Sequence, residues 1–151
     1  MTPVDETAYV EFFRTAEDKH IFLLQESVAK AYWHSIFPSG TSSYFDIPNE
    51  HWIASSGTIR VCEWISAYNA NEPSVVEKSL RLSIPWTTHV GVRFCVNHSL
   101  IFQTTWTIFL RNWNAFLGIH DDCPIVLPNP DVCPYEAIVF TPLGDILFIQ
   151  R

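Results

Sequence analysis

The chain has 151 residues, of which 48% are hydrophobic, 15% aromatic and 17% charged, and its formal net charge is −7. This length fits one domain over residues 1–151, and the acidic balance disfavours nucleic acid and anionic membrane as direct partners, because both require a basic surface. The chain does not open with a basic segment followed by an apolar run, and no apolar run is long enough to span a bilayer. We therefore expect a cytoplasmic protein whose four cysteines are reduced.

The first part of the chain predicts helices. Over residues 3–14, a proline at the first helical position and apolar residues one turn apart predict a short amphipathic helix. Residues 19–37 leave two alternatives, a short strand at 20–25 followed by a helix at 27–37, or one continuous helix. Periodicity does not separate these alternatives for a short apolar run, and we favour the helix at 27–37, ended by Pro38.

The next part of the chain is rich in rings but has little regular pattern. Residues 38–57 predict a loop, and because loops carry function more often than cores do, we expect a contact surface there. Its candidate contact residues are Tyr44, Phe45, Asp46 and Trp52. The alternative is that the rings pin the loop to the body of the protein. Residues 58–68 fit a strand or a short helix, and a helix is predicted from residue 71 through Leu82.

The second half contains clearer patterns. Apolar residues alternate over 90–96, and residues 100–103 return after an Asn-His turn, which together predict a hairpin. A second hairpin is predicted from residues 137–141 and 146–150. Between the hairpins, residues 124–127 predict a short strand, and the Pro-Asn-Pro-Asp sequence that follows predicts a rigid turn.

The strongest predicted element is a helix between Thr104 and Gly118. Its apolar residues have the i, i+3, i+4, i+7 spacing that lines one face of a helix: Trp106, Phe109, Leu110, Trp113, Phe116 and Leu117. A threonine at 104 or 105 caps its start, and Gly118 stands where a left-handed C-terminal cap belongs. Three polar residues lie off the apolar face and are expected to contact water or a partner: Arg111, Asn112 and Asn114.

These elements together predict an α+β fold. Two hairpins supply an antiparallel sheet of about four strands, and the apolar face of the helix is large enough to require a sheet or other helices to cover it. The predicted architecture is therefore an antiparallel sheet covered by this central amphipathic helix and by the N-terminal helices.

Acidic residues gather after the central helix. Asp121 and Asp122 follow its C-terminus, where they oppose the helix dipole, so helix stability does not explain their presence. With Asp131 and Glu136 they predict an acidic patch for a basic partner. The alternative is that their side chains only stabilise turns.

Cysteine and histidine residues supply the alternatives to a binding function. His120, Cys123 and Cys133 are zinc-ligand types, but no second closely spaced pair completes a tetrahedral set. A disulfide between these two cysteines is not expected in a reducing compartment. Cys95 and His98 are candidates for a nucleophile and its base, yet the pattern predicts no exposed pocket around them. We therefore expect no metal and no cofactor.

No phosphate-binding glycine loop, nucleophile elbow or zinc-protease motif occurs in the sequence, which favours a non-enzymatic function. A small, acidic, aromatic-rich chain of this kind resembles bacterial toxin-immunity proteins in size, charge and texture, and the closing stretch EAIVFTPLGDILFIQR is loosely similar to theirs. The resemblance implies a cytoplasmic protein that binds and neutralises a cognate basic toxin. Alternatives are a phage-encoded inhibitor, a homodimeric scaffold, and a small Cys/His- or metal-dependent enzyme or ligand-binding domain.

Overall fold

The computed structural model of the protein describes residues 2–3, 20–119 and 123–151. Most of the helix predicted over 3–14 lies outside these residues, as do His120, Asp121 and Asp122. Thr2–Pro3 form a two-residue strand, β1, which pairs with β2 (Phe22–Leu23). The predicted start of a helix at Pro3 is therefore wrong, because the backbone at this position pairs with a strand that is distant in the sequence.

Within the described residues, eight strands form one sheet in the order β1-β2-β5-β4-β6-β7-β8-β3, with every neighbouring pair antiparallel. The other strands are β3 (Gly57–Glu63), β4 (Gly91–Cys95), β5 (Ile101–Thr105), β6 (Ile125–Pro128), β7 (Glu136–Phe140) and β8 (Asp145–Gln150). The α+β class with an antiparallel sheet is confirmed, but the prediction of about four strands is wrong. The extra strands lack the alternation that marks a strand, since β1 and β2 have two residues each and all four residues of β6 are buried.

The two predicted hairpins are confirmed. β4 and β5 pair along their whole length, with Arg93 opposite Gln103, and β7 and β8 pair with Val139 opposite Leu147. The short strand predicted at 124–127 is β6, which pairs with β4 on one side and β7 on the other. This one strand joins the two hairpins into a single sheet.

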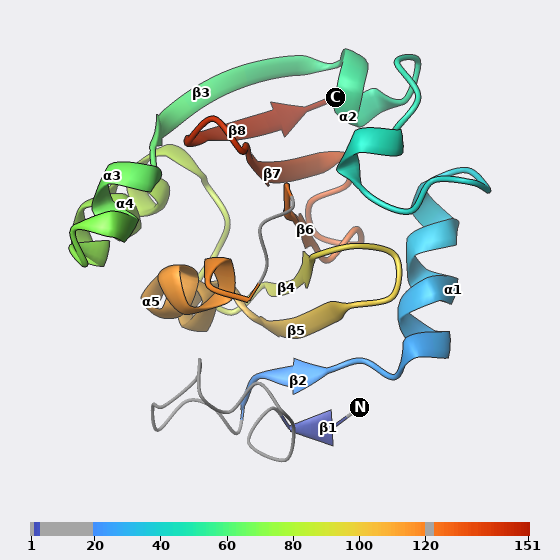
Figure 1. Ribbon diagram of the computed structural model, residues 1–151, viewed down its shortest axis with the longest axis horizontal. Helices are drawn as coiled ribbons and strands as arrows, with labels where there is room; N and C mark the ends of the chain where they lie inside the picture. The colour runs from blue at the N-terminus through green and yellow to red at the C-terminus, as the bar shows by residue number, and fades with distance from the viewer. Residues whose placement is uncertain (1, 4–19, 120–122) are drawn as a thin grey trace.

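One face of the sheet is covered by α5 (Trp106–Leu117) and α4 (Pro73–Ser83), with α3 (Ile65–Asn69) beside them (Figure 1). The predicted apolar face of α5 is buried in this layer: its two tryptophans and two phenylalanines are at most 1% exposed. Ring contacts join Phe109 of α5 to Phe94 of the sheet and to Phe140 on the neighbouring hairpin. The helix is thus part of the protein core.

The ends and the middle of α5 differ from the sequence in detail. Thr105 caps the start, where its hydroxyl accepts a hydrogen bond from the Ile108 N–H at 3.4 Å, as predicted. Gly118 has φ of −69°, so the predicted left-handed cap is wrong, and its N–H instead bonds to carbonyls of the last turn. Asn112 is buried rather than solvent-facing. A kink at this residue, with φ of −123°, turns the side chain back so that its amide donates to the Ile108 carbonyl at 2.8 Å.

The opposite face of the sheet is covered by α1 (Glu26–Ile36), which stands on the other side of the sheet from α5 in Figure 1, and by α2 (Trp52–Ser55). The strand β2 followed by α1 confirms the favoured alternative for residues 19–37. Trp33 and Phe37 fill the space between α1 and the sheet, and the Trp33 indole N–H donates to the Thr41 carbonyl at 2.7 Å. The sheet is therefore the middle layer of three.

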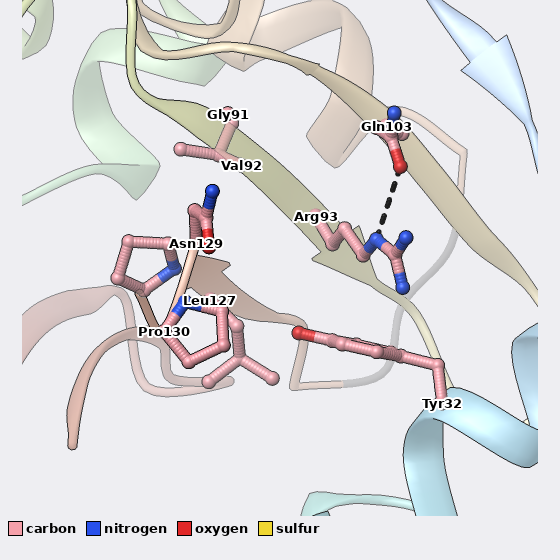
Figure 2. A pocket seen from close by; sticks show the side chains of 9 residues that line it. Tyr32, Gly91, Val92, Arg93, Gln103, Leu127, Asn129 and Pro130 are labelled. Atoms are coloured by element: carbon pink, nitrogen blue, oxygen red, sulfur yellow. Dashed lines mark hydrogen bonds between the residues drawn. The ribbon is translucent and has the colours of Figure 1, made fainter. Parts of the chain in front are cut away.

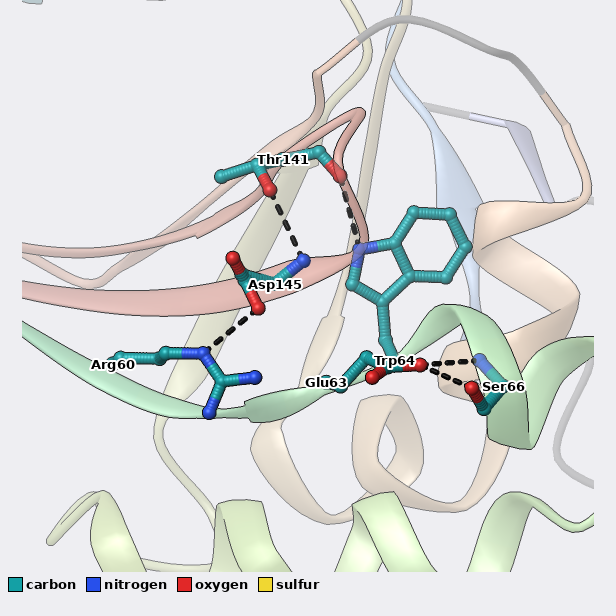
Figure 3. Close-up of polar contacts among 6 residues, drawn as sticks. All are labelled: Arg60, Glu63, Trp64, Ser66, Thr141 and Asp145. Atoms are coloured by element: carbon teal, nitrogen blue, oxygen red, sulfur yellow. Dashed lines mark hydrogen bonds and ion pairs between the residues drawn. The ribbon is translucent and has the colours of Figure 1, made fainter.

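The edge strand β3 is held on the β7–β8 hairpin by polar contacts (Figure 3). The guanidinium Nε of Arg60 lies 2.8 Å from a carboxylate oxygen of Asp145, and the indole N–H of Trp64 donates to the Thr141 carbonyl at 3.1 Å. α3 begins directly after β3, and the Glu63 carboxylate accepts hydrogen bonds from the backbone and hydroxyl of Ser66. Residues 58–68, which fitted a strand or a helix, are thus a strand followed by a helix.

The helix predicted from residue 71 through Leu82 is α4, and it ends before Pro85 as expected. The predicted loop at 38–57 contains only the short 3₁₀-helix η3 (Tyr44–Asp46) and the four-residue α2. Within the described ranges, every helix is too short or too polar to cross a bilayer.

Candidate binding groove

Two adjoining hollows lie between α1 and the loop that follows β6. They share Tyr32 on α1 with Leu127, Pro128 and Pro130 at the end of β6. The first hollow, which we call the basic pocket, has a volume of about 410 Å³ and is completed by Arg93, Gln103 and Asn129 with Gly91 and Val92 (Figure 2). The second, which we call the aromatic groove, has a volume of about 490 Å³ and is completed chiefly by Ile36, Trp52, Cys133, Pro134 and Tyr135.

The wall that the two hollows share forms where β6 ends at two prolines. Pro128 is the last residue of β6, and a second proline at 130 prevents the ladder from continuing. Asn129 fixes the turn from both sides: its N–H donates to the Gly91 carbonyl at 2.9 Å, and its side-chain oxygen accepts from the Asp131 N–H at 3.0 Å. The predicted rigid turn is therefore present, and it holds the loop against the ends of β4 and β5.

Arg93 is the charged group of the basic pocket. Its carbon Cζ lies 4.2 Å from the ring centroid of Tyr32, a cation–π contact, and its Nε–H donates to the side-chain oxygen of Gln103 at 3.1 Å. Figure 2 shows the guanidinium held between these two side chains. No carboxylate of the described residues forms an ion pair with Arg93. The other residues of its strand, β4, are apolar. The pocket is thus a region of positive charge on an acidic protein.

Tyr32 contributes a neutral hydroxyl to the same pocket. Burial is the main cause that raises the pKa of its phenol, and the positive charge of Arg93 opposes this only in part. The phenol therefore keeps its proton at every pH at which the protein is expected to work, and it remains able to donate a hydrogen bond.

The two loops that line the aromatic groove carry exposed apolar side chains. Trp52 contacts Tyr135 edge-on, with ring centroids 5.8 Å apart. The guanidinium carbon of Arg151 lies 4.7 Å from the centroid of the Tyr135 ring. Phe45, Val132 and Tyr135 are 60%, 58% and 53% exposed. The loop at 38–57 and the loop after β6 therefore come together at this groove, although they are about 80 residues apart in the sequence.

Some of the contact residues predicted from the sequence lie at an exposed surface, and others hold the loop at 38–57 against the body of the protein. Trp52 lines the aromatic groove and Phe45 is exposed, as expected of a contact surface. Tyr44 is half-buried against the core on the α1 side, which is the pinning role. The Asp46 carboxylate accepts hydrogen bonds from the Ser42 N–H at 3.2 Å and the Ser42 hydroxyl at 2.5 Å, and these bonds lower the pKa of this carboxyl group. Asp131 is exposed on the loop after β6.

The cysteine and histidine candidates among the described residues do not assemble into a reactive site. Cys95 is buried, and burial raises the pKa of its thiol to about 12, with Arg93 as a weaker opposing influence. A buried, protonated thiol is a poor nucleophile, so the pairing of Cys95 with His98 finds no support. Cys123 is buried and Cys133 is half-buried; no disulfide joins them, and burial raises the pKa of the Cys133 thiol. Of the described residues, no three His, Cys, Asp or Glu side chains gather as a metal site.

Sequence reasoning missed the residues that define the basic pocket. The sequence patterns predict none of Arg93, Tyr32 and Gln103 as a site residue. The one available signal was a lone arginine in an otherwise apolar strand, because a charge placed inside a two-sided sheet needs a partner or a function.

Comparison with known proteins gives one match. The family described as "Protein of unknown function (DUF2947)" matches residues 11–144 of the chain. No curated protein and no solved structure matches the chain.

Proposed function

We propose that this chain, which belongs to the DUF2947 family, is a protein-binding module that contacts a basic partner through the rim of the aromatic groove. The single observation that carries the proposal is the contact of Trp52 with Tyr135, which joins two distant loops that also expose Phe45 and Val132. Single exposed apolar residues are ordinary, but a cluster of them beside a groove is typical of interaction surfaces. Aromatic anchors of this kind carry much of the binding energy in protein interfaces.

Charge supports a basic partner. The net charge of −7 steers a positively charged protein toward the chain. The two loops at the groove carry Asp46, Glu50 and Asp131, and Glu136 at the start of β7 lines the groove. Two arginines, Arg93 and Arg151, offset this charge only in part. Aromatic anchors inside an acidic rim give both affinity and a fast association rate.

We further propose that the partner is a toxin effector, which the chain neutralises in the cytoplasm. The support for this step is the resemblance in size, charge and texture to toxin-immunity proteins, together with the acidic surface that a basic toxin would require. Asp131 and the residues of the aromatic groove are the proposed contacts from the described part of the chain.

The test uses the gene that lies next to the gene for this chain. Its product is expressed alone and together with the chain, and cell growth is measured. We expect growth to stop when the neighbour is expressed alone and to recover when the wild-type chain is present. The double variant Phe45→Ser with Tyr135→Asn is expected not to rescue growth, because each anchor contributes about 2 kcal/mol or more, roughly 30-fold in affinity. Asn is chosen at 135 because this residue has φ of 57°, which Asn tolerates.

A matched control carries Leu82→Ser with Leu143→Ser, which removes two exposed apolar side chains away from the groove. It should rescue growth as the wild type does. A neighbour that is not toxic, or a groove variant that rescues as well as the control, contradicts the proposal. Light scattering on the same proteins tests self-association, and a dimer that is lost only in the groove variant would assign this surface to a second copy of the chain instead.

A further inference from the structure

We propose that the basic pocket binds a carboxylate, carried by an acid with a short apolar group. The proposal goes beyond protein docking at the aromatic groove and does not rest on it. It is built on the geometry of Arg93, on the hydrogen-bonding state of the side chains around it, and on the apolar walls of the pocket.

Arg93 is positioned to receive an anion. Its Nε–H is already bonded to Gln103 and its Cζ lies 4.2 Å from the centroid of the Tyr32 ring, so the guanidinium is held in one orientation. The hydrogen bond to Gln103 leaves the two terminal nitrogens for a ligand, and Figure 2 shows one of them directed toward the Tyr32 ring. A guanidinium that is held in this way loses little side-chain entropy when it forms the paired N–H···O bonds that carboxylates accept.

The other polar side chains of the pocket offer donors. The Gln103 oxygen accepts from Arg93 and the Asn129 oxygen accepts from the Asp131 N–H, so the free end of each amide is its NH₂ group. The orientation of both amides follows from chemistry, because only an oxygen can accept from these N–H donors. Tyr32 adds a protonated hydroxyl. A pocket that holds one cation and is lined by such donors fits a ligand group that only accepts hydrogen bonds.

The charge favours a monoanion. Among the described residues, Arg93 is the only cationic side chain that lines the pocket, and no helix starts among the lining residues. Phosphate dianions are usually met by several cations or by a helix N-terminus. A carboxylate carries one charge and two oxygens, which matches one guanidinium.

The rest of the pocket sets the class of the acid. Leu127, Pro128 and Pro130 supply apolar surface, and the volume of about 410 Å³ lies in the range of roughly 300–1,000 Å³ that small-molecule sites occupy. Space for an apolar group is open beside Gly91, since a methyl group built there would touch nothing within 4 Å. The pocket therefore fits an acid with a small ring or short branched chain.

The experiment titrates the full chain, labelled with ¹⁵N, with sodium benzoate and with benzamide, its uncharged isostere. We expect benzoate to shift the N–H signals of Gly91, Arg93 and Asn129 in a saturable way, and benzamide to bind at least about tenfold more weakly. Arg93→Met keeps the apolar stem and removes the charge, so it should weaken benzoate binding by about tenfold or more, the effect of one lost charge-assisted hydrogen bond. Arg81→Met on α4 removes the same charge from an exposed site and should change nothing.

A second variant guards against a folding defect in Arg93→Met. Gln103→Glu places a carboxylate opposite Arg93 in the β4–β5 register, where it occupies the guanidinium from within the chain. It should abolish benzoate binding while the thermal midpoint stays unchanged or rises. The groove variant Phe45→Ser with Tyr135→Asn should bind benzoate normally, which separates this proposal from the proposed protein docking.

The source of the carboxylate is tested by a blocked tripeptide, acetyl-Ala-Pro-Phe, with a free or an amidated C-terminus. A free-acid peptide that binds more tightly than benzoate, and loses binding on amidation, assigns the pocket to the C-terminus of a protein. Benzoate binding without peptide binding assigns it to a small acid. Equal affinity for benzoate and benzamide, an equal response of Arg93→Met and Arg81→Met, or no saturable shift with any probe overturns the proposal.

Discussion

Removal of the Trp113 ring tests whether α5 is core or interface. Trp113 is fully buried, its indole N–H donates to the Pro73 carbonyl of α4 at 2.9 Å, and its ring is stacked on Phe140 with centroids 6.5 Å apart. The side chain thus ties helix to helix and helix to sheet. Trp113→Ala leaves a cavity between α4, α5 and the sheet.

The cost follows from the buried area. A buried tryptophan removes about 150–250 Å² from water, and at about 25 cal/mol per Å² this corresponds to roughly 4–6 kcal/mol. The retained Cβ and partial collapse of the cavity reduce this figure, so we expect Trp113→Ala to lower the free energy of unfolding by about 3–5 kcal/mol. Trp113→Phe keeps most of the ring and removes the bond to Pro73, and we expect a loss of about 1–2 kcal/mol.

Urea unfolding followed by far-UV circular dichroism measures both losses, with an unchanged slope as the sign that the unfolding reaction is the same. The free energies are compared with that of Trp52→Ala, in which the ring is only half-buried. If Trp113→Ala is as stable as the wild type, or no less stable than Trp52→Ala, the core assignment is refuted.

Two further predictions concern the backbone and pH. Gly144 and Gly40 both have positive φ, 101° and 90°, but a Cβ at 144 would lie 2.7 Å from a methyl carbon of Ile65, whereas one at 40 would meet nothing. Gly144→Ala should therefore destabilise the protein clearly more than Gly40→Ala, which carries only the conformational strain of about 1–2 kcal/mol; equal losses in thermal unfolding would contradict the clash. Burial raises the pKa of the Cys95 thiol to about 12, above its unfolded value of about 8.5, so its contribution to stability is complete below about pH 8.5 and is lost as pH rises toward 12. Urea unfolding from neutral to alkaline pH should show this fall, and a Cys95→Ala variant with an equally steep fall would contradict the assignment.

The local patterns of the sequence were sufficient for the elements whose signal is complete within a few turns. The 3.6-residue period placed α5 from Trp106 to Leu117, and the period of two placed the hairpins β4–β5 and β7–β8. These predictions succeeded because each element buries one defined face. They gave only a weak signal for the short strand β6, in which both faces are buried, and they failed at Asn112, where a kink that no pattern marks turns a polar side chain inward.

The residues of the candidate site could likewise be predicted only in part. The sequence located the ring-rich loop that contains Phe45 and Trp52, because aromatic residues in a loop are visible in composition. It did not locate Tyr135 as the partner of Trp52, since their contact joins segments that are far apart in the chain.

By itself, the sequence determined the secondary structure near strong periodic signals, the acidic charge and the absence of established catalytic motifs. Only the tertiary structure decided the order of eight strands and the meeting of Tyr32, Arg93, Gln103 and Asn129 in one pocket. The physical reason is that helix and hairpin patterns arise from neighbours in the chain, whereas a pocket arises from long-range strand pairing. Arg93 lies beside Tyr32 and Asn129 because β6 pairs with β4 and α1 covers the same face, and neither relation is written in the residues around Arg93.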